Sequence, residues 1–362
     1  MAKSKKYILL ALLTAIGMSL LIALLGCSGH TIGNKDTTKI MDSYRREVKV
    51  PNDVQRIATV GSATRLVVYA GAVDKLVAIT EMDRPSELRP YTIAYEKEFK
   101  DLPTTNNGNH LNSTTVDEEK MLEIKPDVII STRSGDECEK LQEDTKIPVV
   151  GIDAQGDLLD DKFSNAIQIV GLASGTSEQA NQLIGYMRGL YNELYNAVKP
   201  TSPRLYRGAV NYKGSKDLTG TYSDFNVYKT ISATNVAENP NIKGAYDTTL
   251  EQILAWDPEY IFMDYSNKDK VAQQIEKQPE AFKRLQAFNN NKVYFCAPFN
   301  NNGTNVEYAL CECYLTAKVI YPEVFSYVNL EQKFAEIINR HLGKDIYQEL
   351  VSRGVYFGPA QF

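Results

Sequence analysis

Two glutamates, Glu119 and Glu251, occupy the same position in a segment that the sequence contains twice. In both copies, residues 115–130 and 247–262, the glutamate lies seven residues before a proline, and an acidic residue and a run of strand-forming residues follow that proline. This pattern predicts a short helix that the proline ends, followed by a buried strand. A carboxylate in the first turn of a helix is favoured by the helix dipole, which alone would account for a glutamate there. Because the unit occurs in both halves of the chain, we expect two similarly built lobes.

Residue types that carry catalysis or bind metals form no known motif in this chain. The sequence has no Gly-x-Ser-x-Gly turn, no His-Glu-x-x-His pair and no Gly-Lys-Ser/Thr phosphate loop, which are the patterns of nucleophilic, zinc-dependent and nucleotide chemistry. It contains only three histidines, and no group of cysteines and histidines has the spacing of a structural zinc site. We therefore expect neither an enzyme nor a resident metal or cofactor.

The cysteines are too few to build a fold from disulfides. Besides Cys27 there are Cys138, Cys296, Cys311 and Cys313. Cys311 and Cys313 are two residues apart on a predicted helix and face away from each other, so a bond between them is not expected. A bond from Cys296 to either one stays geometrically open, and buried free thiols are the favoured alternative.

The first 26 residues have the pattern of a secretory signal, in which three lysines precede an apolar run from Tyr7 to Leu25. The run ends in Leu24-Leu25-Gly26-Cys27, which resembles a bacterial lipobox, so we expect cleavage before Cys27 and a lipid on the new amino terminus. An uncleaved membrane anchor is the alternative, because the run is nearly long enough to span a bilayer. Either way, the rest of the chain is expected outside the cytoplasm and tethered to the cell membrane.

Removal of residues 1–26, which carry three lysines and no acidic residue, changes the net charge from −5 to −8. An acidic chain is not expected to bind nucleic acid. After a polar tether at residues 27–50, strands and helices alternate at the spacing of an α/β fold with mostly parallel sheets. We assign residues 51–173 to an amino-terminal α/β lobe and residues 201–362 to a carboxy-terminal α/β lobe.

Residues 174–200 are predicted to form one long helix that links the lobes. Steps of three and four residues place nine apolar side chains on one face: Ala180, Leu183, Ile184, Met187, Leu190, Tyr191, Leu194, Tyr195 and Val198. Thr176 and Gln179 have the spacing of a capping box, and Pro200 ends the helix. A helix of about 23 residues is roughly 35 Å long, enough to act as a strut that restricts hinge motion. An ordinary amphipathic helix packed within the first lobe is the alternative.

Several segments resemble a known family. They are the predicted opening strand, turn and helix at residues 56–70, residues 71–77 (GAVDKLV), the first repeated unit, Asn235-Val236-Ala237, the second repeated unit, Val293-Tyr294 and residues 321–325 (YPEVF). In this order, they make the chain similar to the substrate-binding proteins of ABC importers for iron complexes and cobalamin, over most of residues 56–325. The resemblance implies a periplasmic-binding-protein fold of class III, with two α/β lobes joined by one long α-helix. It also implies a monomeric carrier that docks on an ABC importer permease.

The resemblance gives the two glutamates a role. In that family a glutamate on each lobe binds arginines of the permease, and the matching residues here are Glu119 and Glu251. One carboxylate on each lobe makes a two-point clamp that fixes the orientation of docking more than its strength. Stabilisation by the helix dipole is the simpler alternative, but it does not explain why the unit is repeated.

The ligand is expected between the lobes, at the carboxyl ends of the strands, where α/β sheets present their loops. The residues nominated there are Ser62, Thr64, Met82, Arg84, His110 and Arg133 from the first lobe, and Tyr212, Tyr222, Asp264, Tyr265, Phe299 and Asn302 from the second. Each of them could equally be a solvated loop side chain.

Arginine and tyrosine suit a carboxylate, catecholate or oxyanion-bearing ligand, which favours a ferric siderophore, that is, a transported iron chelate. A haem carrier would use an axial ligand, for which Met82 or His110 could serve. Cobalamin is a further alternative, and so is a tetrahedral oxyanion such as molybdate or tungstate, which would need amides and hydroxyls rather than aromatic walls. A membrane-tethered enzyme or an adhesin is the alternative of another class.

Overall fold

The computed structural model describes residues 36–106, 116–154, 161–197, 201–211 and 214–362. The chain divides into two units after Thr37, and the second, Thr38–Phe362, is compact and contains both of the larger sheets. Cys27 and the predicted signal lie outside the described residues. Within the described residues, no helix has the length and apolar character needed to cross a membrane.

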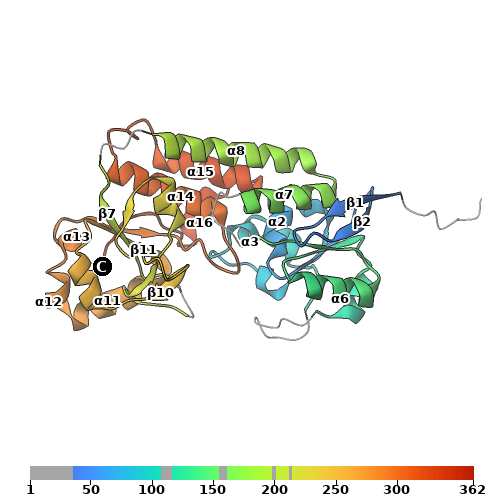
Figure 1. Ribbon diagram of the computed structural model, residues 1–362, viewed down its shortest axis with the longest axis horizontal. Coiled ribbons are helices and arrows are strands. Elements are labelled where there is room, and N and C mark those ends of the chain that lie inside the picture. The colour runs from blue at the N-terminus through green and yellow to red at the C-terminus, as the bar shows by residue number, and fades with distance from the viewer. Residues whose placement is uncertain (1–35, 107–115, 155–160, 198–200, 212–213) are drawn as a thin grey trace, which may run out of the picture. The chain divides into compact units, whose positions relative to one another are not determined.

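Two mainly parallel sheets organise the second unit (Figure 1). The amino-terminal sheet has the order β4-β3-β5-β6 and is formed by Leu76–Ala78, Ile57–Val60, Val128–Ser131 and Val149–Gly151. The carboxy-terminal sheet has the order β13-β12-β11-β7-β9 and is formed by Gly358–Pro359, Val293–Cys296, Tyr260–Asp264, Arg204–Gly208 and Thr234–Asn235. Among the described strands of these two sheets, every pairing is parallel except that of β13 with β12, so the predicted α/β class with mostly parallel sheets is confirmed.

Helices alternate with these strands. Before the carboxy-terminal sheet they are α2 (Ala63–Tyr69), α3 (Pro90–Ala94), α4 (Glu96–Phe99), α5 (Glu118–Ile124), α6 (Gly135–Thr145), α7 (Asp161–Ser174) and α8 (Ser177–Asn196). After β7 they are α9 (Asn226–Thr230), α10 (Leu250–Trp256), α11 (Lys268–Lys277), α12 (Pro279–Phe282), α13 (Gln286–Asn289), α14 (Val306–Ile320), α15 (Leu330–Leu342) and α16 (Tyr347–Ser352). A small sheet of β8 (Gly220–Tyr222) and β10 (Ala245–Asp247) pairs antiparallel.

The repeated unit is confirmed in both halves of the fold. α5 follows Asp117 and α10 follows Thr249, and each of these side chains accepts a hydrogen bond from the backbone amide three residues later. Both helices end on a residue with positive φ, Lys125 (51°) and Asp257 (41°), directly before the proline. Each helix then leads into an inner strand of its sheet, β5 or β11.

An arginine completes each copy of the unit. Arg56, before β3, donates to a carbonyl in the last turn of α5 at 2.6 Å, and Arg204, at the start of β7, donates to a carbonyl in the last turn of α10 at 2.6 Å. The acidic residues that follow the prolines accept from the amides of these arginines, Asp127 at 3.0 Å and Glu259 at 3.1 Å. The two halves therefore share bonds as well as sequence spacing.

The long helix is confirmed as α8, which has 20 residues rather than about 23. It packs against α7 and also contacts α9 and α14. Six of the nine predicted apolar residues are buried, but Tyr195 is exposed and stacks on Tyr191 with ring centroids 5.4 Å apart. The predicted capping box is wrong. The Thr176 hydroxyl forms a hydrogen bond with that of Ser174 at 2.7 Å, and it accepts none from an amide of the helix.

Part of the predicted tether is folded. β1 (Thr37–Met41) and β2 (Glu47–Pro51) form a two-stranded sheet, so the tether prediction for residues 27–50 is wrong beyond residue 36. The physical reason is the alternation of buried and exposed residues in β2. Val48 and Val50 are buried, and Glu47 and Lys49 are exposed. Asp42, in the turn, accepts from the Gly151 amide at 3.1 Å and so ties this sheet to β6.

Candidate functional site

A loop from the carboxy-terminal half, residues 299–305, joins β12 to α14 and is bound by two arginines of the amino-terminal half. Arg65, on α2, donates from Nη1 to the Asn302 carbonyl at 2.8 Å and from Nη2 to the Asn301 carbonyl at 2.9 Å. Arg89 donates from Nη1 to Oδ1 of Asn301 at 2.6 Å. These bonds join segments more than 200 residues apart in sequence and lie where the two sheets present their loops.

Both arginines are buried and have only neutral oxygen partners. Arg65 is 2% exposed and lies over the ring of Tyr91 at 5.0 Å, and Arg89 is 9% exposed. In the part of the chain that the structure describes, neither guanidinium has a carboxylate within ion-pair distance, and the Nε of each has no acceptor. A buried cation normally has a counter-charge, so this pair is suited to an anion.

Neutral hydrogen-bond donors surround the arginines. Ser62 bonds to Thr132 through its amide at 2.8 Å and its hydroxyl at 3.2 Å. The Nδ2 group of Asn302 is buried and has no acceptor among the described residues. Gly303 has φ +92°, and a Cβ there would lie 2.5 Å from Nη1 of Arg65 and 3.3 Å from Oγ of Ser62, so the loop approaches α2 as closely as glycine allows. We call Ser62, Arg65, Arg89, Asn301 and Asn302 the arginine junction.

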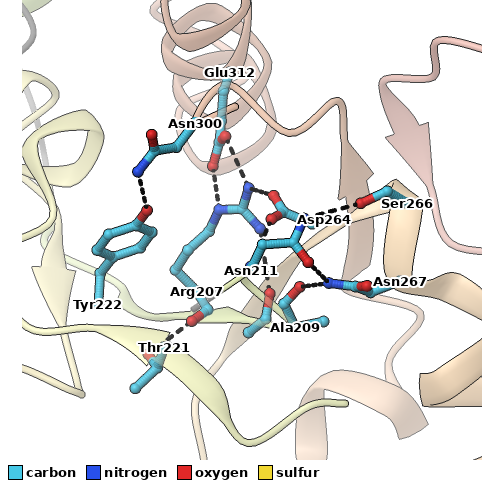
Figure 2. A network of polar contacts seen from close by, with 11 residues as sticks. Arg207, Ala209, Asn211, Thr221, Tyr222, Asp264, Ser266, Asn267, Asn300 and Glu312 are labelled. Atoms are coloured by element: carbon cyan, nitrogen blue, oxygen red, sulfur yellow. Dashed lines mark hydrogen bonds and ion pairs between the residues drawn. The ribbon is translucent and has the colours of Figure 1, made fainter. Parts of the chain in front are cut away.

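A second buried network lies in the carboxy-terminal half and is centred on Arg207 of β7 (Figure 2). Arg207 donates from Nη2 to Asp264, at the end of β11, and its Nε lies 2.8 Å from Oε1 of Glu312 on α14. All three side chains are buried, and Asp264 also accepts from the Asn211 amide at 3.3 Å. Two carboxylates thus share one guanidinium.

Because this network has two carboxyl groups and one guanidinium, it retains a proton near neutral pH. Burial raises the pKa of Glu312 to about 7, although Arg207 opposes the shift and Asp264 adds to it. Burial also raises the pKa of Asp264, against the attraction of Arg207. The network is therefore close to neutral when one carboxyl is protonated.

The Glu312 carboxyl should make the protein less stable as the pH rises. Its folded pKa of about 7 lies above the ordinary value of 4.5, so the folded state binds more protons than the unfolded state between these pH values. The stabilising contribution is complete below about pH 4.5 and is lost as the pH rises to about 7, on the order of 3 kcal/mol at ~1.4 kcal/mol per pKa unit. Urea unfolding of Glu312→Gln should show a smaller decline over this range. Glu323→Gln, at an exposed position after α14, should keep the parental slope, and equal slopes for Glu312→Gln and parent would contradict the assignment.

An aromatic group lies beside the loop. Tyr222 stacks on Phe225 and Phe299 with centroid distances of 5.3 and 6.4 Å, and its hydroxyl accepts from Nδ2 of Asn300 at 3.1 Å. Phe225 and Phe299 are buried and lie 5.9 Å apart. Burial raises the pKa of Tyr222, so its phenol stays protonated. These rings pack chiefly on one another rather than forming a wide exposed wall.

The structure brings part of the nominated residues together. Ser62 and Asn302 belong to the arginine junction, and Tyr222 and Phe299 flank the same loop. Asp264 lies in the Arg207 network, where its charge is already paired. Predictions for His110 and Tyr212 lie outside the described residues.

Other nominated residues serve the fold instead. Thr64 is fully buried and donates to Asp83 at 2.6 Å, so its hydroxyl is already bound within the amino-terminal half. Arg84 binds three carbonyls of residues 99–102, at 2.8 to 3.3 Å. Because the guanidinium of Arg84 is bound to these carbonyls, it is not available to the arginine junction.

The structure shows the surroundings of three further nominated residues. Arg133 lies 3.7 Å from Glu137, Met82 is half-buried in a single turn at Glu81–Asp83, and Tyr265 packs on Tyr356 at 5.1 Å. Tyr265 lines a separate pocket of about 180 Å³. The strand-end rule therefore nominated some residues at the arginine junction and others with different surroundings.

Sequence reasoning missed Arg65, Arg89, Arg207 and Glu312. A usable signal exists for two of them, because Arg65 interrupts the apolar run of α2 and Arg207 interrupts that of β7. A charge inside a buried element needs a partner or a ligand, so both deserved nomination.

The remaining predictions about single residues concern cysteines, metal ligands and the two repeated glutamates. The four described cysteines are buried and free, which confirms the favoured alternative. No group of three or more potential metal ligands occurs within the described ranges. Glu119 and Glu251 are exposed in the first turns of α5 and α10, a position compatible with either docking or stabilisation by the helix dipole.

Known proteins resemble this chain in sequence and in fold. The family model described as "Periplasmic binding protein" matches residues 57–298. The molybdate-binding protein MolA of Haemophilus influenzae is 26% identical over 320 residues, which cover 81% of this chain and 87% of MolA. Solved structures resemble the fold at lower identity and indicate the fold alone.

Three of these structures span most of the chain. A periplasmic solute binding protein from Veillonella parvula gives a TM-score of 0.69 at 19% identity, covering 88% of this chain and 97% of that one. Molybdate-bound MolA of Haemophilus influenzae gives 0.64 at 20% identity, covering 85% and 98%. The periplasmic heme binding protein HutB of Vibrio cholerae gives 0.56 at 18% identity, covering 74% and 99%.

Proposed function

The chain belongs to the periplasmic binding protein family, and from that premise we propose that it captures a small oxyanion of the molybdate type and delivers it to an ABC importer. The observation that carries the oxyanion is the pair of buried guanidinium groups, Arg65 and Arg89, which have no carboxylate partner among the described residues. An anion seated between them would supply a counter-charge at bonding distance, whereas the buried Glu307 acts on Arg65 only from farther away. Ser62 and the Nδ2 group of Asn302 add neutral donors, as a tetrahedral oxyanion requires.

The curated relative supports the same ligand class, because MolA of Haemophilus influenzae is a molybdate-binding protein. The ligand would reach the junction by displacing loop carbonyls from Arg65 or by engaging Nε and the amide of Asn302. Cys27 would carry the lipid that holds the protein at the outer face of the cell membrane. The permease would bind through Glu119 and Glu251.

A ferric siderophore is the second candidate. Tyr222 and Phe299 favour it, since they place a phenol and a stacked ring beside the loop. Because these rings are largely covered by one another and by Phe225, they offer little face to a wide chelate. The small oxyanion therefore fits the junction better.

Calorimetry and thermal unfolding on the ligand-depleted protein test the proposal. Molybdate or tungstate should bind at one site per chain and raise the melting temperature by several degrees, since ligand at 100 times Kd stabilises by about 2.7 kcal/mol. Sulfate and phosphate serve as size and charge controls, and a ferric catecholate chelate and haem as the competing class. Saturable binding of the chelate or haem without any response to the oxyanions would overturn the proposal.

A further inference from the structure

A pocket of about 220 Å³ lies between the end of α2, the first half of α8 and the end of α15. None of its described lining residues belongs to loop 299–305 or to the arginine junction. Its volume exceeds that of the ~150 Å³ apolar cavity that is known to take up benzene. The pocket is therefore large enough for a small organic molecule and separate from the proposed solute site.

The inner wall is mostly apolar and aromatic. Val68, Tyr69, Leu183 and Leu342 line it, and each is buried. Tyr69 has no spare polar function for a ligand, because its hydroxyl donates to Glu307 on α14. An apolar or aromatic body would be buried well against these side chains.

His341 supplies an unused acceptor in this wall. It is 2% exposed, and its ring meets those of Tyr69 and Tyr186 edge-on at 5.6 and 6.3 Å. Nδ1 lies 2.8 Å from the carbonyl of Ile337, and because a carbonyl can only accept, Nδ1 carries the proton. Nε2 is then a bare lone pair, and it is buried without a hydrogen-bond partner among the residues that the structure describes.

The state of His341 does not change in the physiological range. Burial lowers the pKa of its imidazole to about 4, so the ring is neutral at pH 7 and Nε2 stays an acceptor. A buried acceptor without a donor destabilises the folded protein. A ligand that offers a hydroxyl or N–H group would satisfy it.

The mouth of the pocket is polar and positively charged. Arg340 and the glutamines Gln179 and Gln182 line it and are exposed. The guanidinium of Arg340 lies over the ring of Tyr186 at 5.6 Å, and within the described residues no carboxylate pairs with it. A positive charge at the entrance, held flat by an aromatic ring, favours a carboxylate at the outer end of a ligand.

We propose that this pocket binds a small hydroxylated carboxylic acid with a ring-sized apolar body, whose hydroxyl donates to Nε2 of His341 and whose carboxylate pairs with Arg340. The body lies among Val68, Leu183 and Leu342. A single histidine without further ligands does not make a metal site, and the apolar wall does not suit an inorganic anion. The site is thus a second ligand site, distinct in chemistry from the arginine junction.

Three probes separate the two ends of the ligand. 4-Hydroxybenzoate carries both groups, benzoate lacks the donor and phenol lacks the carboxylate. Titration of the full protein, saturated with molybdate, should give binding of 4-hydroxybenzoate with at least fivefold weaker binding of each partial probe. The ¹⁵N resonance of Nε2 in ¹⁵N-histidine-labelled protein should move with 4-hydroxybenzoate and phenol but not with benzoate.

Variants at the exposed mouth keep the test independent of folding. Arg340→Gln should weaken 4-hydroxybenzoate at least fivefold and leave phenol unchanged, and Gln182→Trp, which places an indole over the entrance, should weaken both. Arg284→Gln, at an exposed position in the other half of the fold, should change neither. Binding of none of the probes, or binding that is insensitive to both mouth variants, would mean that the pocket holds water only and would overturn the proposal. Loss of molybdate binding would bear on the solute site alone.

Discussion

Replacement of Arg65 by glutamine is expected to weaken oxyanion binding at least 30-fold, or about 2 kcal/mol at ~1.4 kcal/mol per tenfold change. Arg65 is 2% exposed and donates only to the carbonyls of Asn301 and Asn302. No carboxylate lies within ion-pair distance of Arg65 among the described residues, and the buried Glu307 acts on it only from farther away. The loss of a buried charge-assisted contact typically costs about 2–5 kcal/mol. Calorimetry with molybdate or tungstate measures the effect.

Two control variants separate charge from loop anchoring. Arg84→Gln removes a guanidinium of the same half of the fold that also binds three carbonyls, those of Phe99, Lys100 and Leu102, and it should lower the melting temperature without changing affinity. Asn301→Ala removes the side-chain partner of Arg89 but leaves both charges, so affinity should change less than threefold. Equal losses in all three variants would show that the arginines only hold the loop in place.

The sequence was sufficient to predict the α/β class and the unit that is repeated in both halves of the fold. The signal was local, since the cap, proline and acidic residue of each repeated unit lie within about 15 residues, and in both halves the structure has the short helix and the following strand that the pattern predicts. The two-stranded sheet at residues 37–51 was missed because its strands are short and its burial depends on contact with the distant β6. Short strands at an edge carry too few residues for their alternation to be distinguished from a polar linker.

The arginine junction could not be predicted in the same way. Its bonds connect Arg65 and Arg89 with residues 301 and 302, and nothing local specifies how far a loop from one half reaches over a helix of the other. Thr64, the nominated neighbour, points into the core, and Arg65, one position later, faces the loop, as adjacent residues on a helix must diverge. Asp264 was nominated correctly as a strand-end acid, but Arg207 on the neighbouring strand already binds it.

The symmetry of the repeated units also bears on docking. Each glutamate is exposed in the first turn of a helix whose two ends are fixed, at the start by a cap and at the end by an arginine and a positive-φ residue. Rigid support of this kind places two carboxylates at defined positions, one in each half of the fold. Stabilisation by the helix dipole requires no such support, because it acts on any first-turn acid.

Reversal of both charges, Glu119→Lys with Glu251→Lys, is expected to reduce uptake at least tenfold while molybdate affinity stays within twofold. If the permease presents arginines at these points, as the docking proposal requires, lysines there would face like charges, and juxtaposed like charges cost several kcal/mol. Each lysine also loses the dipole interaction, about 0.3–1 kcal/mol, so a small drop in melting temperature is expected.

Cellular molybdenum content, measured in cells that depend on this protein, gives uptake, and calorimetry gives affinity. A charge-matched pair at exposed positions on other helices, Glu178→Lys in the first turn of α8 with Glu276→Lys on α11, should transport normally. Unchanged uptake in the Glu119 and Glu251 pair would leave the glutamates only a helix-stabilising role, and a parallel loss of affinity would place them at the ligand instead.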